Sequence, residues 1–451
     1  MHNDLTSAPI PILIRRLAIP AGTGFFFNTM FNVVDIWYGG KLSTAALAAM
    51  SLSFPVFFII LAFGTGVSTS ATSLIGNALG RKSHAEAHTY IFQAISFALI
   101  NAVLISILGL LLAPQIFLFL GAKGEYLALA LSYMNIIFYG APFFMLNFVM
   151  SAILNANGNT VPYRNFLIAG FFLNLILDPW FMYGGFGLPP MGLPGIAIAT
   201  VVIQCLGNLF LFKQLFRFGA IKDFPVCNLL PSYHYFRELA KQGFPAALNM
   251  MTVSLGIFII TWYVARFGQE AVAAYGIATR IEQIALLPVM GLNISTLSLT
   301  AQNFGARRLD RIREVLSISL RYGFAMASIG TLAALVFTSQ LISFFTSDPT
   351  VIAIGIQCLK VEALVFPAYV LLYICVSAMQ GIKQPLFALW IGLYRQFAAP
   401  AAVFHLLAFV MGWGIIGIWW GVFTVTWSAA LIVVFYVTWV LKRLEKELDA
   451  G

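Results

Sequence analysis

Four acidic residues stand inside long apolar segments of this 451-residue chain: Asp35, Asp178, Glu282 and Glu362. An ionised carboxylate at the centre of a bilayer costs about 2.5–3.5 kcal/mol on insertion scales, so such residues usually face the protein interior and serve a function. The chemistry open to them is the reversible binding of a proton or a small cation. The cysteines have no metal or redox spacing, and no cofactor is expected apart from the coupling ion.

Two of these acids belong to polar helix faces. Residues that recur at spacings of three and four lie on one face of a helix. The first face consists of Gly24, Asn28, Asn32, Asp35 and Gly39, and the second of Asn174 and Asp178. Both acids lie within about two turns of the outer ends of their expected helices, which places them at similar depth.

A pair formed by Asp35 and Asp178 would be a coupling site for protons or Na⁺. Burial and mutual repulsion both oppose the doubly ionised state, which can bring proton release into the physiological range. The amides of Asn28 and Asn174 could hold the site, with Asn32 on the same face. Alternatively, Asp35 caps a helix end near the interface and Asp178 belongs to a break before the proline that follows it.

The other two acids each have a basic residue two positions before them. Arg280 precedes Glu282, and Lys360 precedes Glu362. We expect Glu282 to pair with Arg280 and Glu362 with Lys360, while Arg395 on a later segment could neutralise one glutamate. A structural ion-pair cluster is favoured over a second coupling site, because charges within membranes commonly pair with one another.

Polar residues on other segments could line a substrate cavity. They are Tyr139, Asn147, Ser151, Asn155, Gln204, Asn249 and Thr252. Their alternative role is hydrogen bonding between helices, which is common in membrane bundles.

Pro20 lies in the middle of the first apolar segment. A proline there removes an N–H and clashes with the preceding turn, which bends a helix. The bend is either static or part of a conformational switch.

The elements that must hold these residues are membrane-spanning helices. The chain is 61% hydrophobic and 9% charged, with a mean hydropathy of +0.91, whereas a soluble protein is about 25% charged. The apolar runs can cross about 30 Å of hydrocarbon as helices, and they lack the alternation of barrel strands. Twelve spans are predicted, at 12–38, 51–76, 90–119, 127–153, 163–184, 194–216, 241–265, 272–301, 318–345, 351–379, 385–410 and 414–441.

The basic residues predict the orientation of these helices. Nineteen lie in one set of loops and three in the other, so the positive-inside rule places both termini in the cytoplasm. No cleavable signal peptide is apparent, and the first helix is expected to stay in the membrane. The net charge of +9 is split among many loops, which argues against nucleic-acid binding.

The two halves of the chain form an internal repeat with a nearly constant offset. Aligned pairs include Pro20 with Pro245, Gly66 with Gly291, and Gly80 with Gly305. An offset of six helices gives two units of the same orientation, a plan of transporters whose parallel repeats rock about a central cavity. We therefore expect an N-lobe over 1–216, a cytoplasmic linker over 217–240 and a C-lobe over 241–451.

Several motifs resemble those of the multidrug and toxic compound extrusion (MATE) transporters. The first helix carries VDIWYGG at 34–40 and then AALAA at 45–49, and the paired loops read GNALGR at 76–81 and AQNFGA at 301–306. Within that family the chain is more similar to the DinF-like branch, whose acids on the first and fifth helices match Asp35 and Asp178. NorM-like members carry an acid on the seventh helix, where this chain has Asn249. Thr200 resembles a family residue that joins the acidic cluster.

The resemblance implies a monomeric multidrug efflux antiporter of the bacterial inner membrane, not an enzyme. Such a protein exports amphipathic, often cationic compounds while protons, or Na⁺, enter. An alternative is a flippase for lipid-linked oligosaccharides or polyprenyl lipids, which would need basic residues to hold pyrophosphate. The only basic residues far from the ends of the spans are Arg280, Lys360 and Arg395, all in the second half. A channel or structural membrane protein is a third, less favoured interpretation.

Overall fold

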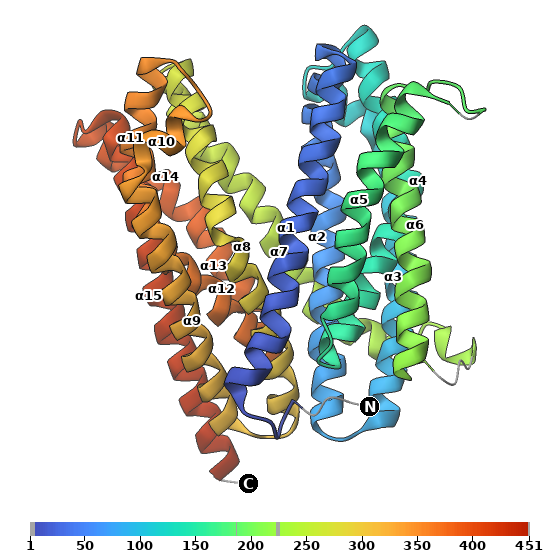
Figure 1. Ribbon diagram of the computed structural model, residues 1–451. Coiled ribbons are helices and arrows are strands. Elements are labelled where there is room, and N and C mark those ends of the chain that lie inside the picture. The colour runs from blue at the N-terminus through green and yellow to red at the C-terminus, as the bar shows by residue number, and fades with distance from the viewer. Residues whose placement is uncertain (1–4, 186, 222–225, 450–451) are drawn as a thin grey trace. The chain divides into compact units, whose positions relative to one another are not determined.

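The computed structural model describes residues 5–185, 187–221 and 226–449 of the chain. In this part the only regular elements are helices, apart from one isolated bridge between Gly185 and Leu188. Eleven of the described helices are long and apolar enough to cross a membrane, or twelve if a pair bent by 46°, Pro349–Ala363 and Phe366–Gly381, is one span. The prediction of an all-helical membrane protein with about twelve spans is confirmed (Figure 1).

The first half of the chain supplies six long helices. They are α1 (Ile10–Leu42), α2 (Thr44–Gly80), α3 (His84–Phe119), α4 (Gly124–Ala156), α5 (Val161–Tyr183) and α6 (Leu193–Phe218). Each exceeds the roughly 20 residues that cross the hydrocarbon core. A short 3₁₀ turn, η1 (Val226–Leu229), precedes the second half.

The second half repeats this plan with more interruptions. Its elements are α7 (Tyr233–Val264), η2 (Ala265–Phe267), α8 (Gln269–Gly305), α9 (Leu309–Val336), α10 (Thr338–Ser343), α11 (Pro349–Ala363), α12 (Phe366–Gly381), α13 (Pro385–Leu393), η3 (Tyr394–Ala398), α14 (Ala399–Phe404), η4 (His405–Val410) and α15 (Gly414–Asp449). The segments η3 and η4 are π-helical.

The turns after the second helix of each repeat show the same backbone. The helix α2 ends at Gly80 and α8 at Gly305. Two residues later, Lys82 and Arg307 adopt left-handed conformations, with φ of 59° and 57°. Such angles are uncommon outside glycine, so their recurrence at equivalent positions of the two halves agrees with the repeat that the sequence predicts.

By internal packing the chain divides into two units. Among the described residues, the first lies within Thr23–Ala247, and the second joins Leu5–Gly22 to the chain after Ala247. The boundaries fall inside α1 and α7, at equivalent places of the two repeats, so each repeat begins within the other unit. These packing units differ from the lobes expected at 1–216 and 241–451, which remain a prediction about the parts that move.

Close backbone contacts at glycines explain the unit boundaries. They hold the first part of α1 in the second unit and the first part of α7 in the first unit. A Cβ on Gly291 of α8 would overlap the carbonyl oxygen of Ala18 and lie 2.8 Å from the amide nitrogen of Gly22. In the first unit, a Cβ on Gly66 of α2 would lie 2.5 Å from the carbonyl oxygen of Gly243 in α7. Small residues let helix backbones approach this closely in membranes.

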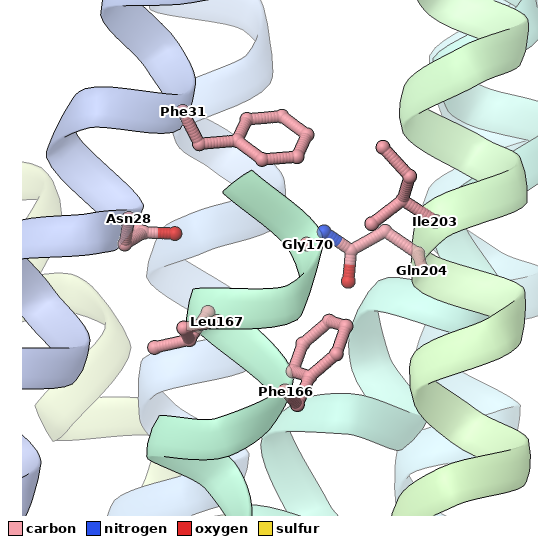
Figure 2. Close-up of a pocket in the computed structure, with 7 residues that line it drawn as sticks. All are labelled: Asn28, Phe31, Phe166, Leu167, Gly170, Ile203 and Gln204. Atoms are coloured by element: carbon pink, nitrogen blue, oxygen red, sulfur yellow. The ribbon is translucent and has the colours of Figure 1, made fainter. Parts of the chain in front are cut away.

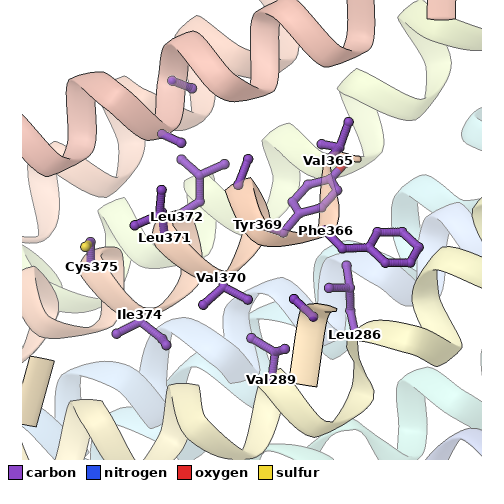
Figure 3. Packing of buried hydrophobic residues seen from close by; sticks show 14 of the residues in the cluster. Leu286, Val289, Val365, Phe366, Tyr369, Val370, Leu371, Leu372, Ile374 and Cys375 are labelled. Carbon is purple, nitrogen blue, oxygen red and sulfur yellow. The ribbon is translucent and has the colours of Figure 1, made fainter. Parts of the chain in front are cut away.

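The core of the second unit is built around α12. Phe366, Val370 and Ile374 follow one face of this helix and are fully buried. They lie in one cluster with Leu286 and Val289 of α8 (Figure 3). This packing holds α12 against α8, the helix that carries Glu282.

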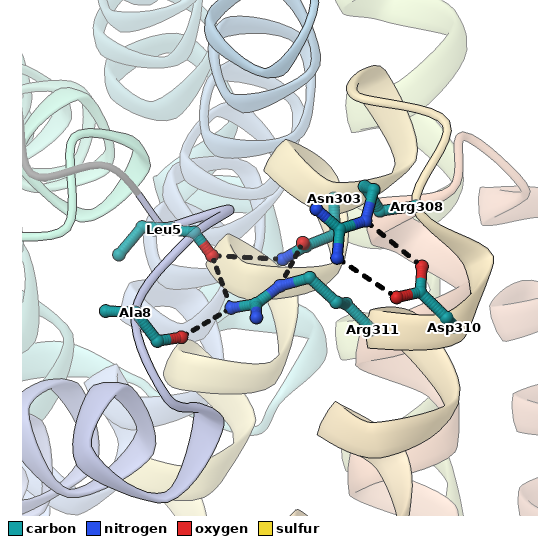
Figure 4. A network of polar contacts seen from close by, with 6 residues as sticks. All are labelled: Leu5, Ala8, Asn303, Arg308, Asp310 and Arg311. Atoms are coloured by element: carbon teal, nitrogen blue, oxygen red, sulfur yellow. Dashed lines mark hydrogen bonds and ion pairs between the residues drawn. The ribbon is translucent and has the colours of Figure 1, made fainter.

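A strap of residues 5–9 before α1 is bound to the turn between α8 and α9 (Figure 4). The Arg311 guanidinium donates to the carbonyl oxygens of Ala8 at 2.6 Å and Leu5 at 3.3 Å, and to Asn303 Oδ1 at 3.0 Å. Asn303 Nδ2 also donates to the Leu5 carbonyl oxygen, and Gln302 Oε1 accepts from the Leu5 amide. Arg311 is only 7% exposed, so these hydrogen bonds must stabilise its buried charge.

An equivalent strap precedes α7 in the first unit. Gln93 of α3 donates through Nε2 to the carbonyl oxygens of Asn228 and Leu230, each at 2.8 Å, and accepts from the Ser232 amide at 2.9 Å. Ser96 Oγ donates to the Leu229 carbonyl oxygen at 2.6 Å. Each strap therefore anchors the start of one repeat to the other repeat's helices.

We expect Arg311→Met to lower the thermal unfolding midpoint more than Arg308→Met. A hydrogen bond to a charged group contributes about 1.5–3 kcal/mol, and Arg311 makes several while buried. Arg308 pairs with Asp310 at 3.1 Å, but its side chain is 50% exposed, and such pairs contribute about 0–1 kcal/mol. Tryptophan fluorescence of the detergent-purified variants would measure both midpoints. Equal shifts would contradict the anchoring role of Arg311.

Candidate functional site

The helices α1, α5 and α6 bring Asp35, Asn174 and Thr200 together in the first unit. Asn174 Nδ2 donates to Asp35 Oδ1 at 2.7 Å. The Thr200 hydroxyl lies 3.5 Å from Asp35 Oδ2 and 3.0 Å from the Ile196 carbonyl oxygen, so its single proton can serve either acceptor. Asp35 is 6% exposed, and the other two are also buried. The Asp35 carboxyl therefore has few donors and little water around it.

Asp178 lies one turn beyond Asn174 on α5, close enough for its carboxyl group to interact with that of Asp35. It is fully buried, and neither of its carboxyl oxygens has a hydrogen-bond partner in the described part of the chain. The Oδ1 of Asn174 is likewise unpartnered there. A buried carboxylate without partners is strongly disfavoured, so this arrangement suits a shared proton or a bound cation.

Two tyrosines near the pair have no counterpart among the predicted site residues. Tyr133 of α4 lies within electrostatic range of Asp35 and Asp178. The Tyr38 hydroxyl donates to the Leu175 carbonyl oxygen at 3.2 Å and so ties α1 to α5 beside Asn174. Tyr38 stands three residues after Asp35, a spacing that could have placed it on this face. Tyr133 belongs to neither of the polar helix faces, and no sequence pattern singles it out.

A small pocket of about 20 Å³ lies among α1, α5 and α6, the helices that carry Asp35, Asp178 and Thr200 (Figure 2). It is lined by Asn28 and Phe31 of α1, Phe166, Leu167 and Gly170 of α5, and Ile203 and Gln204 of α6. Gly170 is one turn before Asn174, and Gln204 is one turn after Thr200. A cavity of this size holds about one water molecule, and its lining begins about one helical turn from the residues that hold Asp35.

The predicted polar residues of the first unit only partly meet at this pocket. Asn147 Nδ2 donates to Gln204 Oε1 at 2.6 Å, which brings α4 to the pocket. The Asn32 amide donates to the Asn28 carbonyl oxygen at 2.8 Å, within its own helix. Tyr139 is instead 69% exposed.

The remaining cavity candidates are not among the residues that line the pocket. Ser151 and Asn155 form a hydrogen bond of 3.4 Å within α4. Asn249 and Thr252 belong to the second unit, where the Thr252 hydroxyl donates to the Asn249 carbonyl oxygen at 2.7 Å. Their role as one cavity lining therefore stays a prediction.

The expected pairs of charges in the second unit are wrong. Among the described residues, Arg280 and Lys360 form no ion pair, and both are exposed. Residues two positions apart in a helix do not face each other, so neither base reaches the acid that follows it.

A different arrangement surrounds the two glutamates. Glu282 lies within electrostatic range of Arg395 and close to Tyr369, over whose ring the Arg395 guanidinium lies 5.2 Å from the centroid. The suggestion that Arg395 neutralises a glutamate therefore fits Glu282. Glu362 is 2% exposed, and its Oε2 has no hydrogen-bond partner in the described part of the chain.

Pro20 lies inside α1, which is one helix from Ile10 to Leu42. It stands two residues before the boundary between the packing units at Gly22. Pro245 occupies the same place in α7, two residues before Ala247. The two prolines therefore occupy equivalent places in the two repeats, and a bend at Pro20 stays a prediction.

No group of three or more His, Cys, Asp or Glu side chains among the described residues could hold a metal ion. The oxygens available to a monovalent cation are those of Asp35, Asp178, Thr200 and Asn174, which are gathered at one place in the first unit.

Comparisons with known proteins give a consistent result. The MatE family profile matches residues 20–180 and 245–399. The chain is 29% identical to the FAD transporter of Shewanella oneidensis, over 87% of each chain. It is 24% identical to the probable multidrug resistance protein YoeA of Bacillus subtilis, over 90% of this chain and 88% of that one.

A solved structure has the same fold. It is an outward-facing multidrug resistance MATE family transporter of the MOP superfamily, with a TM-score of 0.91 and 23% identity over 99% of each chain. At this identity the likeness shows the fold alone.

Proposed function

The chain belongs to the MatE family of membrane transporters, and from this premise we propose that it is a multidrug antiporter. It exports amphipathic, often cationic compounds in exchange for protons, with Na⁺ as the alternative coupling ion. It is a transporter and not an enzyme. Among the relatives, one is named a probable multidrug resistance protein, which supports this substrate class.

The observation that carries the proposal is the buried pair Asp35 and Asp178. The Asn174 amide and Thr200 hydroxyl supply donors to Asp35, while Asp178 has unpartnered oxygens. Loading this site with a proton removes the repulsion between two carboxylates in a dry environment. The loaded and empty states of the first unit therefore differ in local charge.

Ion and drug would be coupled through their preference for different states of the transporter. A ligand shifts a conformational equilibrium only as far as its affinities for the two states differ. Cation loading at Asp35 and Asp178 would favour one state and drug the other, which gives a coupling free energy of about 1–3 kcal/mol in typical cases.

We assign the protein to the DinF-like branch, with both termini in the cytoplasm of a bacterial inner membrane. The acids on α1 and α5 and Asn249 on α7 support the branch, and the distribution of basic residues among the loops supports the orientation. A monomer is proposed because the acidic site draws all of its groups from one chain.

A second candidate function is the transport of a molecule that carries pyrophosphate. Arg280 and Lys360 are exposed and form no ion pair among the described residues, and cationic side chains suit phosphate. The compound could be a lipid-linked oligosaccharide or polyprenyl lipid, or FAD, which one relative is named as transporting.

Proteoliposomes with separately imposed gradients test the proposal. We expect a pH gradient to drive uptake or release of ethidium, and a sodium gradient to have little effect. Transport driven only by sodium would replace the proton as coupling ion. Movement of FAD or of a pyrophosphate lipid without ethidium transport would contradict multidrug export and support the second candidate.

A further inference from the structure

A groove of about 400 Å³ runs between α5 and α6. It is lined by Asn165, Phe166, Ala169, Gly170 and Leu173 of α5, and by Ile203, Leu206, Gly207 and Phe210 of α6. Its volume falls within the range of small-molecule sites, which is about 300–1,000 Å³. Three of these residues, Phe166, Gly170 and Ile203, also line the small pocket among α1, α5 and α6 (Figure 2).

Small residues let α5 and α6 pack closely beside the groove. A Cβ on Gly207 would overlap the ring of Phe166, and a Cβ on Gly170 would lie 3.3 Å from Ile203 Cγ2. Ala169 lines the groove and adds only a methyl group. A larger side chain at Ala169 would occupy part of the groove.

The lining is almost wholly apolar and opens along two membrane-spanning helices. Leu206 on its rim is 44% exposed. On α5 the lining extends from Asn165 to Leu173, which corresponds to about 12 Å along the helix axis. An opening of this kind at membrane depth meets hydrocarbon and not water.

One end of the groove is cationic. The Arg164 guanidinium donates to Asn165 Oδ1 through Nε at 3.1 Å and Nη2 at 2.8 Å, which places it at the end of the groove where Asn165 stands. The helix α5 begins at Val161, so the unpaired N–H groups and positive dipole end of the helix lie within one turn. Arg164 forms no ion pair among the described residues.

We propose that this groove binds a bilayer phospholipid with an anionic headgroup. The phosphate lies at Arg164 and Asn165, where guanidinium groups form strong charge-assisted hydrogen bonds, and one acyl chain lies between α5 and α6. An amphipathic cation has the same apolar part but is repelled by Arg164. The bound chain supports α5, which carries Asn174 and Asp178, against α6, which carries Thr200. The proposal does not depend on which compound is exported.

The test uses the full chain in liposomes with a trace of phosphatidylglycerol that bears a photoactivatable acyl chain. After irradiation, we expect the label on groove residues of α5 and α6, and unlabelled phosphatidylglycerol should displace it about tenfold better than phosphatidylcholine. Ala169→Phe, which fills the groove, should reduce this labelling about tenfold. Arg164→Gln should retain the label but remove the headgroup preference.

Matched variants control for general effects on lipid contact. Leu209→Phe adds an aromatic ring at a 66% exposed position of α6 outside the groove, and Arg217→Gln removes a charge from the last turn of α6. Neither should change the labelling. Equal labelling of all lipid-exposed helices, unchanged labelling in Ala169→Phe, or stronger displacement by ethidium than by phosphatidylglycerol would overturn the proposal.

Discussion

Asp35→Asn is expected to impair gradient-driven transport strongly while the protein still folds and inserts in the membrane. The amide has nearly the same shape as the carboxyl group, so the packing of α1 against α5 and α6 is kept. It cannot take up or release a proton, and it is a poor partner for a cation. Without a coupling free energy, transport under an imposed gradient should fall by about 5–150-fold.

The measurement is ethidium transport in proteoliposomes under an imposed pH gradient, at equal protein incorporation. Asp310→Asn is the matched control, because it makes the same change at a carboxylate whose side chain is 65% exposed and far along the chain from the site. The control should transport as the wild type does. Unimpaired transport by Asp35→Asn would remove Asp35 from the mechanism, whatever the substrate.

The fold could be predicted because its signals are long and repeated. Apolar runs mark the spans, and one nearly constant offset relates glycines and prolines across six helices. The interruptions within the helices were harder to predict from the sequence. The predicted span 351–379 is divided between Ala363 and Phe366, because Pro367 stands in the first turn of α12, where proline begins a helix more readily than it continues one.

The acidic site was also partly predictable from the sequence. Asp35 and Asp178 stand out because ionisable groups are rare in apolar runs, and Asn174 shares a face with Asp178. Tyr133 could not be found, since an isolated tyrosine in an apolar helix carries no periodic signal. The false pairing of Glu282 with Arg280 was avoidable, because a spacing of two places side chains on different faces of a helix.

The second large effect is expected at the crossing of α8 with the first part of α1. Gly291→Ala should lower the free energy of unfolding by about 1–3 kcal/mol, the usual cost of overpacking. The new Cβ would meet backbone atoms of Ala18 and Gly22, and backbone cannot move aside as a flexible side chain can. The helices must therefore separate, or the first part of α1 must shift.

The same substitution at another glycine of α8 should have the opposite effect on the free energy of unfolding. A Cβ on Gly276 of α8 would meet nothing within 4 Å among the described residues, so Gly276→Ala should stabilise the protein by about 0.5–1 kcal/mol through helix propensity alone. Unfolding midpoints of the two variants, measured in the same detergent, should lie on opposite sides of the wild type. Gly66→Ala in α2 should resemble Gly291→Ala, because its Cβ would meet the Gly243 carbonyl oxygen of α7. If Gly291→Ala were as stable as Gly276→Ala, the two helices would not be in fixed backbone contact, and α1 would be free to move against α8 without cost.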